Sequence, residues 1–146
     1  MKHLEFKTQI AADRQTVWNT MLHPETYKEW TNVSWPGSFY QGSWAQGQNI
    51  RFISSNGEGT LATIVEQNPY ENILAKHIAV LQAGGTEDRD SDLAKGWIGT
   101  LERYIFRERE GHTDLTITID TKPEWESMFK EGWPNALAKL KEICER

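Results

Sequence analysis

The sequence predicts an α+β fold in which an antiparallel β-sheet of about six or seven strands curls around one long C-terminal helix. Three observations predict it. Between residues 49 and 121, hydrophobic residues alternate with polar ones in several segments, which is the pattern of half-buried strands. Turn sequences separate these segments, so neighbouring strands pair as antiparallel hairpins. Residues 123–146 carry hydrophobic side chains at helical spacing, and this stripe is left to cover the buried face of the sheet.

The N-terminal region is predicted to hold one strand and a short helix. Residues 3–10 alternate between hydrophobic and polar side chains, which is the period of a strand with one buried face. Asp13 occupies the position of a helix N-cap, and hydrophobic residues then recur at helical spacing as far as Leu22. Pro24 ends this segment, because a proline disfavours helical backbone at the residue before it.

A second short helix is expected over residues 25–30, followed by a loop-rich region. Residues 31–47 are rich in Gly, Ser, Gln and Trp, and this composition predicts a loop with at most one short strand near residues 39–42.

The first hairpin is predicted at Asn56-Gly57, because both residue types tolerate the positive φ that a type I′ turn requires. If these two residues form the loop, Phe52 pairs with Leu61 and the two side chains share one face of the sheet.

The strand after this hairpin, residues 72–81, allows two orientations. Lys76 prefers water, which turns His77 inward, but that choice exposes Ile78 and Val80. The polar segment 82–96 that follows is expected to be a long mobile loop or a loop with one helical turn.

A second hairpin is predicted around Glu110-Gly111. A two-residue loop there pairs Glu102 with Ile119, and the same register pairs positions 104 with 117 and 106 with 115. Because the isoleucines of the second strand must be buried, the carboxylate of Glu102 is predicted to face inward.

The C-terminal helix carries a long apolar stripe on one face. Pro134, beside Gly132, removes one helical hydrogen bond and predicts a kink or a restart near Trp133. Such a break either shapes the mouth of a cavity or only follows the curvature of the sheet. The stripe consists of Trp125, Phe129, Trp133, Leu137, Leu140 and Cys144.

The order of these motifs resembles the START-like superfamily, in the SRPBCC group, and within it the branch homologous to the activator of the heat-shock-protein-90 ATPase. The resemblance covers essentially the whole chain. It implies a helix-grip fold with a cavity between the sheet and the C-terminal helix, which members use for different purposes. The motifs are Ile10-Ala11-Ala12 before Val17-Trp18, His23-Pro24-Glu25 before Trp30, Glu102-Arg103-Tyr104, Thr113-Asp114-Leu115, and Gly132-Trp133-Pro134 before Leu137, Leu140 and Ile143.

Composition narrows the classes of function. The net charge of -5 and the absence of a basic cluster argue against nucleic acids or an anionic membrane surface as partners. No apolar run approaches the roughly 20 residues that span a bilayer, and the N-terminus lacks the pattern of a signal peptide. We therefore expect a cytoplasmic protein of one domain, residues 1–146, without membrane insertion, as a monomer or homodimer.

No motif predicts a metal, a cofactor or a nucleophilic triad. The four histidines are far apart in sequence, no serine lies in a G-x-S-x-G turn, and no glycine-rich phosphate loop is present. Cys144, the single cysteine, is expected to be a small hydrophobic core residue. We assign no catalytic residue from the sequence.

Glu102 and His77 are the two polar candidates. An inward carboxylate is costly unless it is hydrogen-bonded, paired or protonated, so Glu102 either pairs with an Arg or a Trp N–H or serves as a ligand anchor or general acid/base. His77 is its natural companion if it faces inward, and otherwise an ordinary surface or core histidine. Six tryptophans besides Trp18 exceed what one small core packs easily, so two or three are expected to border a cavity.

The favoured function is binding of a small hydrophobic or aromatic molecule between the sheet and the final helix. Two alternatives remain. The resemblance implies a co-chaperone-like interaction module of the stress response, with a chaperone as partner, and some relatives are cyclase- or hydratase-type enzymes, for which Glu102 would be the acid/base. The predicted ligand-binding residues are Phe52, His77, Trp97, Glu102, Tyr104, Phe106, Ile117, Trp125, Phe129 and Trp133.

Overall fold

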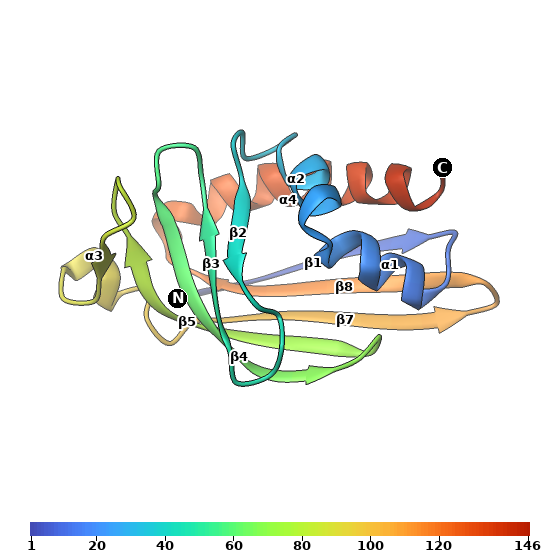
Figure 1. Ribbon diagram of the computed structural model, residues 1–146, viewed down its shortest axis with the longest axis horizontal. Coiled ribbons are helices and arrows are strands. Elements are labelled where there is room, and N and C mark those ends of the chain that lie inside the picture. The colour runs from blue at the N-terminus through green and yellow to red at the C-terminus, as the bar shows by residue number, and fades with distance from the viewer.

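The computed structural model describes residues 1–146 and confirms the predicted fold class. An open antiparallel sheet, with strand order β1-β8-β7-β5-β4-β3-β2 and the short β6 beside β5, curves around the C-terminal helix α4 (Figure 1). The strands are β1 (Lys2–Ile10), β2 (Phe39–Gly42), β3 (Asn49–Ile53), β4 (Gly59–Asn68), β5 (Asn72–Leu81), β6 (Glu87–Asp88), β7 (Leu101–Arg109) and β8 (His112–Thr121).

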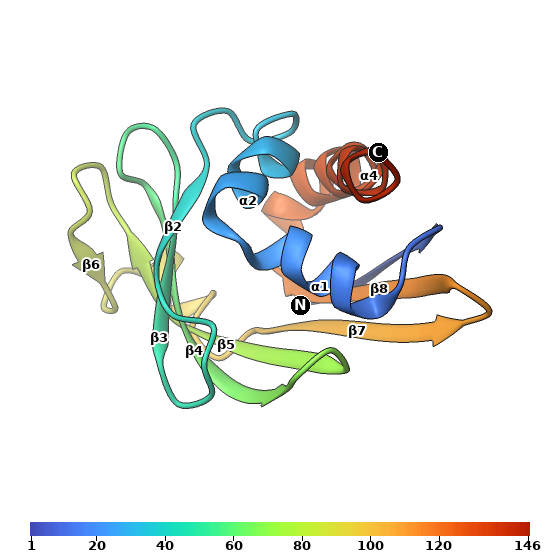
Figure 2. The ribbon, with the colours of Figure 1, turned by 45° about the vertical axis from the view of Figure 1, so that its right-hand side comes forward.

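Three of the helices, α1, α2 and α4, lie together on the concave side of the sheet, and α3 lies apart from them at the end of β5 (Figure 1). Figure 2 looks nearly along α4 and shows α1 and α2 beside it, within the curve of the strands. The helices are α1 (Arg14–Leu22), α2 (Pro24–Thr31), α3 (Asp92–Lys95) and α4 (Glu126–Cys144), and a 3₁₀ turn, η1 (Pro123–Trp125), precedes α4. None of them combines the length and the apolar composition that a membrane crossing needs.

Local capping explains where the first two helices begin. The carboxylate of Asp13 accepts a hydrogen bond from the backbone N–H of Thr16 at 2.8 Å, as the N-cap prediction requires. His23 then ends α1 and caps α2, because its Nδ1 accepts from the backbone N–H of Glu25 at 3.2 Å. The turn between the two helices is therefore held by side chains close to it in sequence.

The β7–β8 hairpin has the predicted register. Glu102 pairs with Ile119, and the loop is Glu110-Gly111. Both loop residues have positive φ, 51° and 80°, which is the backbone of a type I′ turn. The carboxylate of Glu102 faces the concave side, as expected.

The predicted register of the β3–β4 hairpin is wrong by one residue, since Phe52 pairs with Thr60 instead of Leu61. The loop has three residues: the N–H of Ser54 donates to the carbonyl of Glu58 at 2.8 Å, and Gly57 alone has positive φ. A slip of one residue moves a side chain to the opposite face of a sheet. Leu61 therefore lies on the outer face, in a small separate cluster.

Strand β5 uses both orientations that its sequence allows. Ala75 and His77 face inward, but the register against β4 shifts at Ile78, which has no partner. Such a β-bulge reverses the facing of the residues beyond it. Ala79 consequently packs on the outer face and Val80 on the inner face.

Helix α4 runs without interruption through Pro134, so the expected restart near Trp133 is wrong. Pro134 and Lys130, whose carbonyl loses its partner, both lie on the exposed side of the helix, where water can replace the missing bond. Gly132 has another role. Its carbonyl accepts a hydrogen bond from Ser34 Oγ at 2.6 Å, and its lack of a side chain makes room for the ring of Trp35.

Candidate functional site

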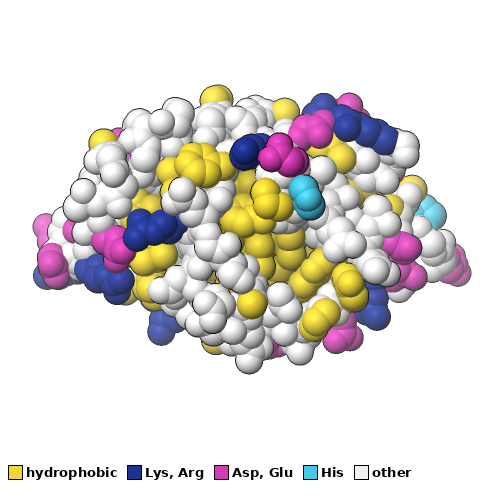
Figure 3. Space-filling model, viewed as in Figure 1, with side chains coloured by type: hydrophobic (Ala, Val, Ile, Leu, Met, Phe, Trp, Pro, Cys, Tyr) yellow, Lys and Arg dark blue, Asp and Glu magenta, His cyan; other side chains and the backbone are white.

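A cavity of about 470 Å³ lies between the inner face of β3–β5, helix α2 and the N-terminal half of α4. Sixteen of its 25 lining residues are hydrophobic. Figure 3 shows hydrophobic side chains through the middle of the face that carries α1 and β2. The cavity therefore occupies space that a fully packed domain would fill with core side chains.

Eight of the ten side chains predicted to bind a ligand line this cavity. Two do not. The ring of Phe106 packs against Trp18 of α1 at 5.1 Å between ring centres, and Ile117 is fully buried in the main core. The eight are Phe52, His77, Trp97, Glu102, Tyr104, Trp125, Phe129 and Trp133.

Tryptophans supply more of the wall than the sequence suggested. Six of the seven tryptophans border the cavity, where two or three were expected, and only Trp18 lies away from it. Tyr27 was missed. It lies three residues before Trp30 and four before Thr31 on α2, and this helical spacing is the signal that could have placed all three on the face toward α4.

Two polar side chains of the cavity lie beside Glu102, which is 9% exposed. The hydroxyl of Tyr104 donates a hydrogen bond to Glu102 Oε2, and His77 Nε2 lies 3.4 Å from Glu102 Oε1. Burial, together with the nearby negative charge of Glu102, raises the pKa of Tyr27 far above its usual value. The hydrogen-bond partner of the carboxylate is thus Tyr104, in place of the expected arginine or indole N–H. His77, the companion expected if it faced inward, lies beside the carboxylate.

Several buried nitrogens around the cavity have no hydrogen-bond partner in the chain. They include both ring nitrogens of His77 and the indole Nε1 atoms of Trp97 and Trp133. By contrast, Trp30 is satisfied, because its Nε1 donates to the carbonyl of Met21 at 3.0 Å. Buried polar groups are usually paired in native proteins, so these nitrogens are exceptional unpaired groups among the residues of the cavity wall.

One part of the cavity wall is formed by the 82–99 segment and the start of α4. The ring of Trp97 lies 4.9 Å from that of Trp125 and stacks on Phe129 at 6.3 Å. Leu93 and Met128 line the cavity nearby and are 38% and 45% exposed. The side chains of this part of the wall are mostly apolar.

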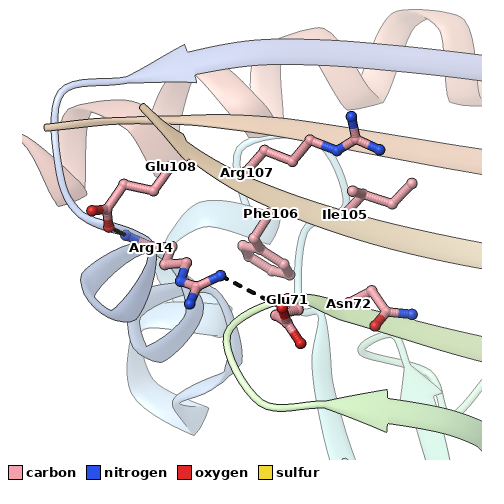
Figure 4. A pocket seen from close by; sticks show the side chains of 7 residues that line it. All are labelled: Arg14, Glu71, Asn72, Ile105, Phe106, Arg107 and Glu108. Atoms are coloured by element: carbon pink, nitrogen blue, oxygen red, sulfur yellow. Dashed lines mark hydrogen bonds and ion pairs between the residues drawn. The ribbon is translucent and has the colours of Figure 1, made fainter. Parts of the chain in front are cut away.

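A second hollow, of about 460 Å³, lies at the far end of β7 (Figure 4). Arg14 reaches toward Glu71, with 3.9 Å between Nη1 and Oε1, and the ring of Phe106 lies beside them. Glu108 accepts a hydrogen bond from the backbone N–H of Arg14 at 2.8 Å. The contacts of Arg14 with Glu71 and Glu108 attach α1 to the sheet, and only two of the seven lining residues are hydrophobic, so this hollow is a weaker candidate. No group of three or more His, Cys, Asp or Glu side chains is arranged to hold a metal ion.

Comparison with known families gives one decisive match. The model of the family described as "Activator of Hsp90 ATPase homolog 1-like protein" matches residues 11–145. The chain belongs to this family. The resemblance inferred from the sequence motifs is therefore confirmed.

Several solved structures have the same fold as this protein, although their sequence identity to it is low. The Aha1 dimer from Colwellia psychrerythraea is 17% identical, with a TM-score of 0.75 over 99% of this chain and 97% of that one. Protein MLL2253 from Mesorhizobium loti is 13% identical, with a TM-score of 0.75 over 97% and 96%. Protein CV1439 from Chromobacterium violaceum is 15% identical, with a TM-score of 0.68 over 99% and 97%. A search among curated proteins finds no match.

Proposed function

We propose that the protein binds a small, largely apolar or aromatic molecule in the cavity between the sheet and α4. One observation carries the proposal: the cavity of about 470 Å³ has a mostly hydrophobic wall and a buried polar cluster at Glu102. Small-molecule sites commonly have about 300–1,000 Å³ and a few polar groups in an apolar lining. The size and the lining of this cavity both fall within that description.

The proposed binding residues are the eight predicted side chains that line the cavity. The six aromatic ones supply flat apolar surface, and covering such surface with a ligand gains about 25 cal/mol per Å² removed from water. His77 and Glu102 supply polar contacts. Phe106 and Ile117 act only through the packing of the core.

The experiment uses a neutral hydrophobic probe, N-phenyl-1-naphthylamine, whose emission rises when it leaves water. Saturable binding at one site per chain is expected. Thr60→Trp, on the inner face of β4, places a bulky ring in the cavity and should weaken binding at least about tenfold. Thr63→Trp is the matched control, because Thr63 lies on the outer face of the same strand, where its hydroxyl donates a hydrogen bond to Asn49 Oδ1. Equal binding by the two variants would refute the proposal.

A second candidate is an interaction with the Hsp90 chaperone, which the family description favours. It predicts that the purified protein raises the ATPase rate of the chaperone from the same host. Thr60→Trp separates the two candidates, since a module that acts through its surface keeps its effect when the cavity is filled. No change in the ATPase rate at saturating protein would exclude this candidate.

A further inference from the structure

The part of the cavity around Glu102 carries negative charge and no fixed positive charge. Glu102 lies there with His77 as its only ionisable basic neighbour, and no Lys or Arg lines any part of the cavity. A second carboxylate, Glu58, lies at the exposed rim. An anionic ligand would therefore approach a buried carboxylate without a cation to offset the repulsion.

The surroundings of Glu102 also hold hydrogen-bond donors without acceptors. The ring centres of His77 and Trp97 are 4.6 Å apart, and the indole N–H of Trp97 is buried without a partner. A neutral imidazole has one donor and one acceptor nitrogen, and neither nitrogen of His77 makes a hydrogen bond in the chain. A hydrocarbon would leave all of these groups unpaired. An organic ammonium ion has no lone pair, so it could not accept a hydrogen bond from the N–H groups.

These two observations together define the group that fits. It must donate a hydrogen bond toward Glu102, accept one from the N–H of Trp97 or His77, and carry no charge. A hydroxyl satisfies all three conditions, because it has one O–H donor and two lone pairs. The surrounding aromatic rings favour a flat ring attached to that hydroxyl.

We propose that the cavity selects an uncharged phenol-type ligand, an aromatic ring bearing a hydroxyl that donates to Glu102 and accepts from Trp97 or His77. This inference rests on the proposed ligand-binding function and specifies its chemistry. The ring occupies the aromatic wall, and the hydroxyl completes the hydrogen bonds of the inner cluster. Specificity of this kind follows from buried polar groups that are left unpaired by the wrong ligand.

The test compares four probes with one ring system by calorimetric titration at pH 7: 2-naphthol, naphthalene, 2-naphthoate and 2-naphthylmethylammonium. The phenol is uncharged at this pH, as tyrosine is. We expect 2-naphthol to bind about ten- to hundredfold more tightly than naphthalene. This ratio of dissociation constants corresponds to the free energy of one hydrogen bond to a charged group. 2-Naphthoate should bind more weakly than naphthalene, and the ammonium probe more weakly than 2-naphthol.

Glu102→Gln links the preference to its residue. It keeps the shape of the side chain and removes the charge, so it should reduce the preference for 2-naphthol severalfold and let 2-naphthoate bind about as well as naphthalene. Glu5→Gln makes the same change in net charge on the exposed face of β1, and it should retain the wild-type order of affinities. If Glu102→Gln does not fold, Trp97→Phe carries the test, because it removes the indole N–H and keeps a ring; it should lower the 2-naphthol preference severalfold.

The outcomes separate this inference from the function on which it rests. If naphthalene binds as tightly as 2-naphthol, the phenol preference is refuted while ligand binding stands. If 2-naphthoate or the ammonium probe binds best, or if neither Glu102→Gln nor Trp97→Phe alters the order, the assigned chemistry is wrong. If none of the four probes binds, both proposals fail.

Discussion

Glu102 is the buried carboxylate of the cavity wall. Its carboxylate is nearly buried, and its partners are the hydroxyl of Tyr104 and the ring of His77. Its inward facing could be predicted, because the period of β8 forces the isoleucines inward and a two-residue loop fixes the pairing. His77 was expected as its companion only if it faced inward, and that facing could not be predicted, because it depends on a bulge in β5.

For Phe106 too, the sequence predicts the face of the sheet on which the side chain lies but not the residues that it contacts. Phe106 faces the concave side, as its register requires, but α1 covers that end of β7 and brings Trp18 against its ring. Alternation along a strand determines which face a side chain takes. It contains no information about which helix lies over that face.

Gly132→Ala tests how tightly α4 packs against the loop after α2. A Cβ at this position would lie 2.7 Å from Trp35 Cζ2, a rigid ring atom, so the ring must move. The overlap costs about 1–3 kcal/mol, against a gain of about 1 kcal/mol in helix propensity. We expect a net loss of about 1 kcal/mol in the free energy of unfolding, measured by urea denaturation. Asn135→Ala, at an exposed position of the same helix, should change stability by less than about 0.5 kcal/mol, and a stabilised Gly132→Ala would contradict the packing argument.

At the scale of elements, the two hairpins show what a turn sequence determines. Asn56-Gly57 has the stronger preference for a type I′ turn, yet it forms a three-residue loop in which only Gly57 has positive φ. Glu110-Gly111 has the weaker preference and forms the two-residue turn. The inward facing of Ile50 and Phe52 on β3 and of Ala62 on β4 requires the longer loop, and burial of a whole face outweighs a local preference.

Glu110→Asn should stabilise the protein. Glu110 has a φ of 51°, in the left-handed region that costs most residues about 1–2 kcal/mol and Asn less. The expected gain is about 0.5–1 kcal/mol in thermal or urea unfolding. Gly111→Ala should act in the opposite direction, because its φ is 80°. A neutral or destabilising Glu110→Asn would show that the turn does not limit the stability of this hairpin.

The segment between β5 and β7 is organised by Asp88. Hydrogen bonds from the side chain and backbone of Ser91, and from Gln82, lower the pKa of Asp88 to about 2. Ser91 in turn caps α3, since its hydroxyl accepts from the backbone N–H of Ala94 at 3.1 Å. The loop that carries Trp97 to the cavity therefore begins with an ionised Asp88.

Asp88→Asn should destabilise the protein near neutral pH and have no effect near pH 2. A carboxylate whose folded pKa is depressed contributes stability above its unfolded pKa of about 4, and this contribution is lost as pH falls through about 2. Urea midpoints of wild type and variant should thus differ at pH 5 and converge toward pH 2. Asp90→Asn is the control, because the Asp90 carboxylate accepts no hydrogen bond in the chain, and a difference that persists unchanged at pH 2 would contradict this assignment.

At the scale of the whole molecule, the sequence predicted the order of the elements, the open sheet around α4 and the family. These follow from periodicity and turn positions, which are local properties. The cavity was less predictable, because its wall combines α1, α2, residues 35–44, β3–β5, the 82–99 segment, β7 and α4. Six tryptophans border it because segments distant in sequence converge there, and no local pattern encodes such convergence.

That convergence leads to the last prediction, an increase in thermal stability on ligand binding. A ligand that binds only the folded chain adds about 2.7 kcal/mol at a free concentration of 100 times Kd. For a chain of this size we expect the melting temperature to rise by roughly 5–10 °C, in one cooperative step, because the ligand contacts all the elements that form the wall. Differential scanning calorimetry with N-phenyl-1-naphthylamine measures the shift. Thr60→Trp should lose the shift, and Thr63→Trp should keep it. If a saturating concentration of the probe leaves the melting temperature of the wild type unchanged, the probe does not bind the folded chain in preference to the unfolded chain, and the prediction is wrong.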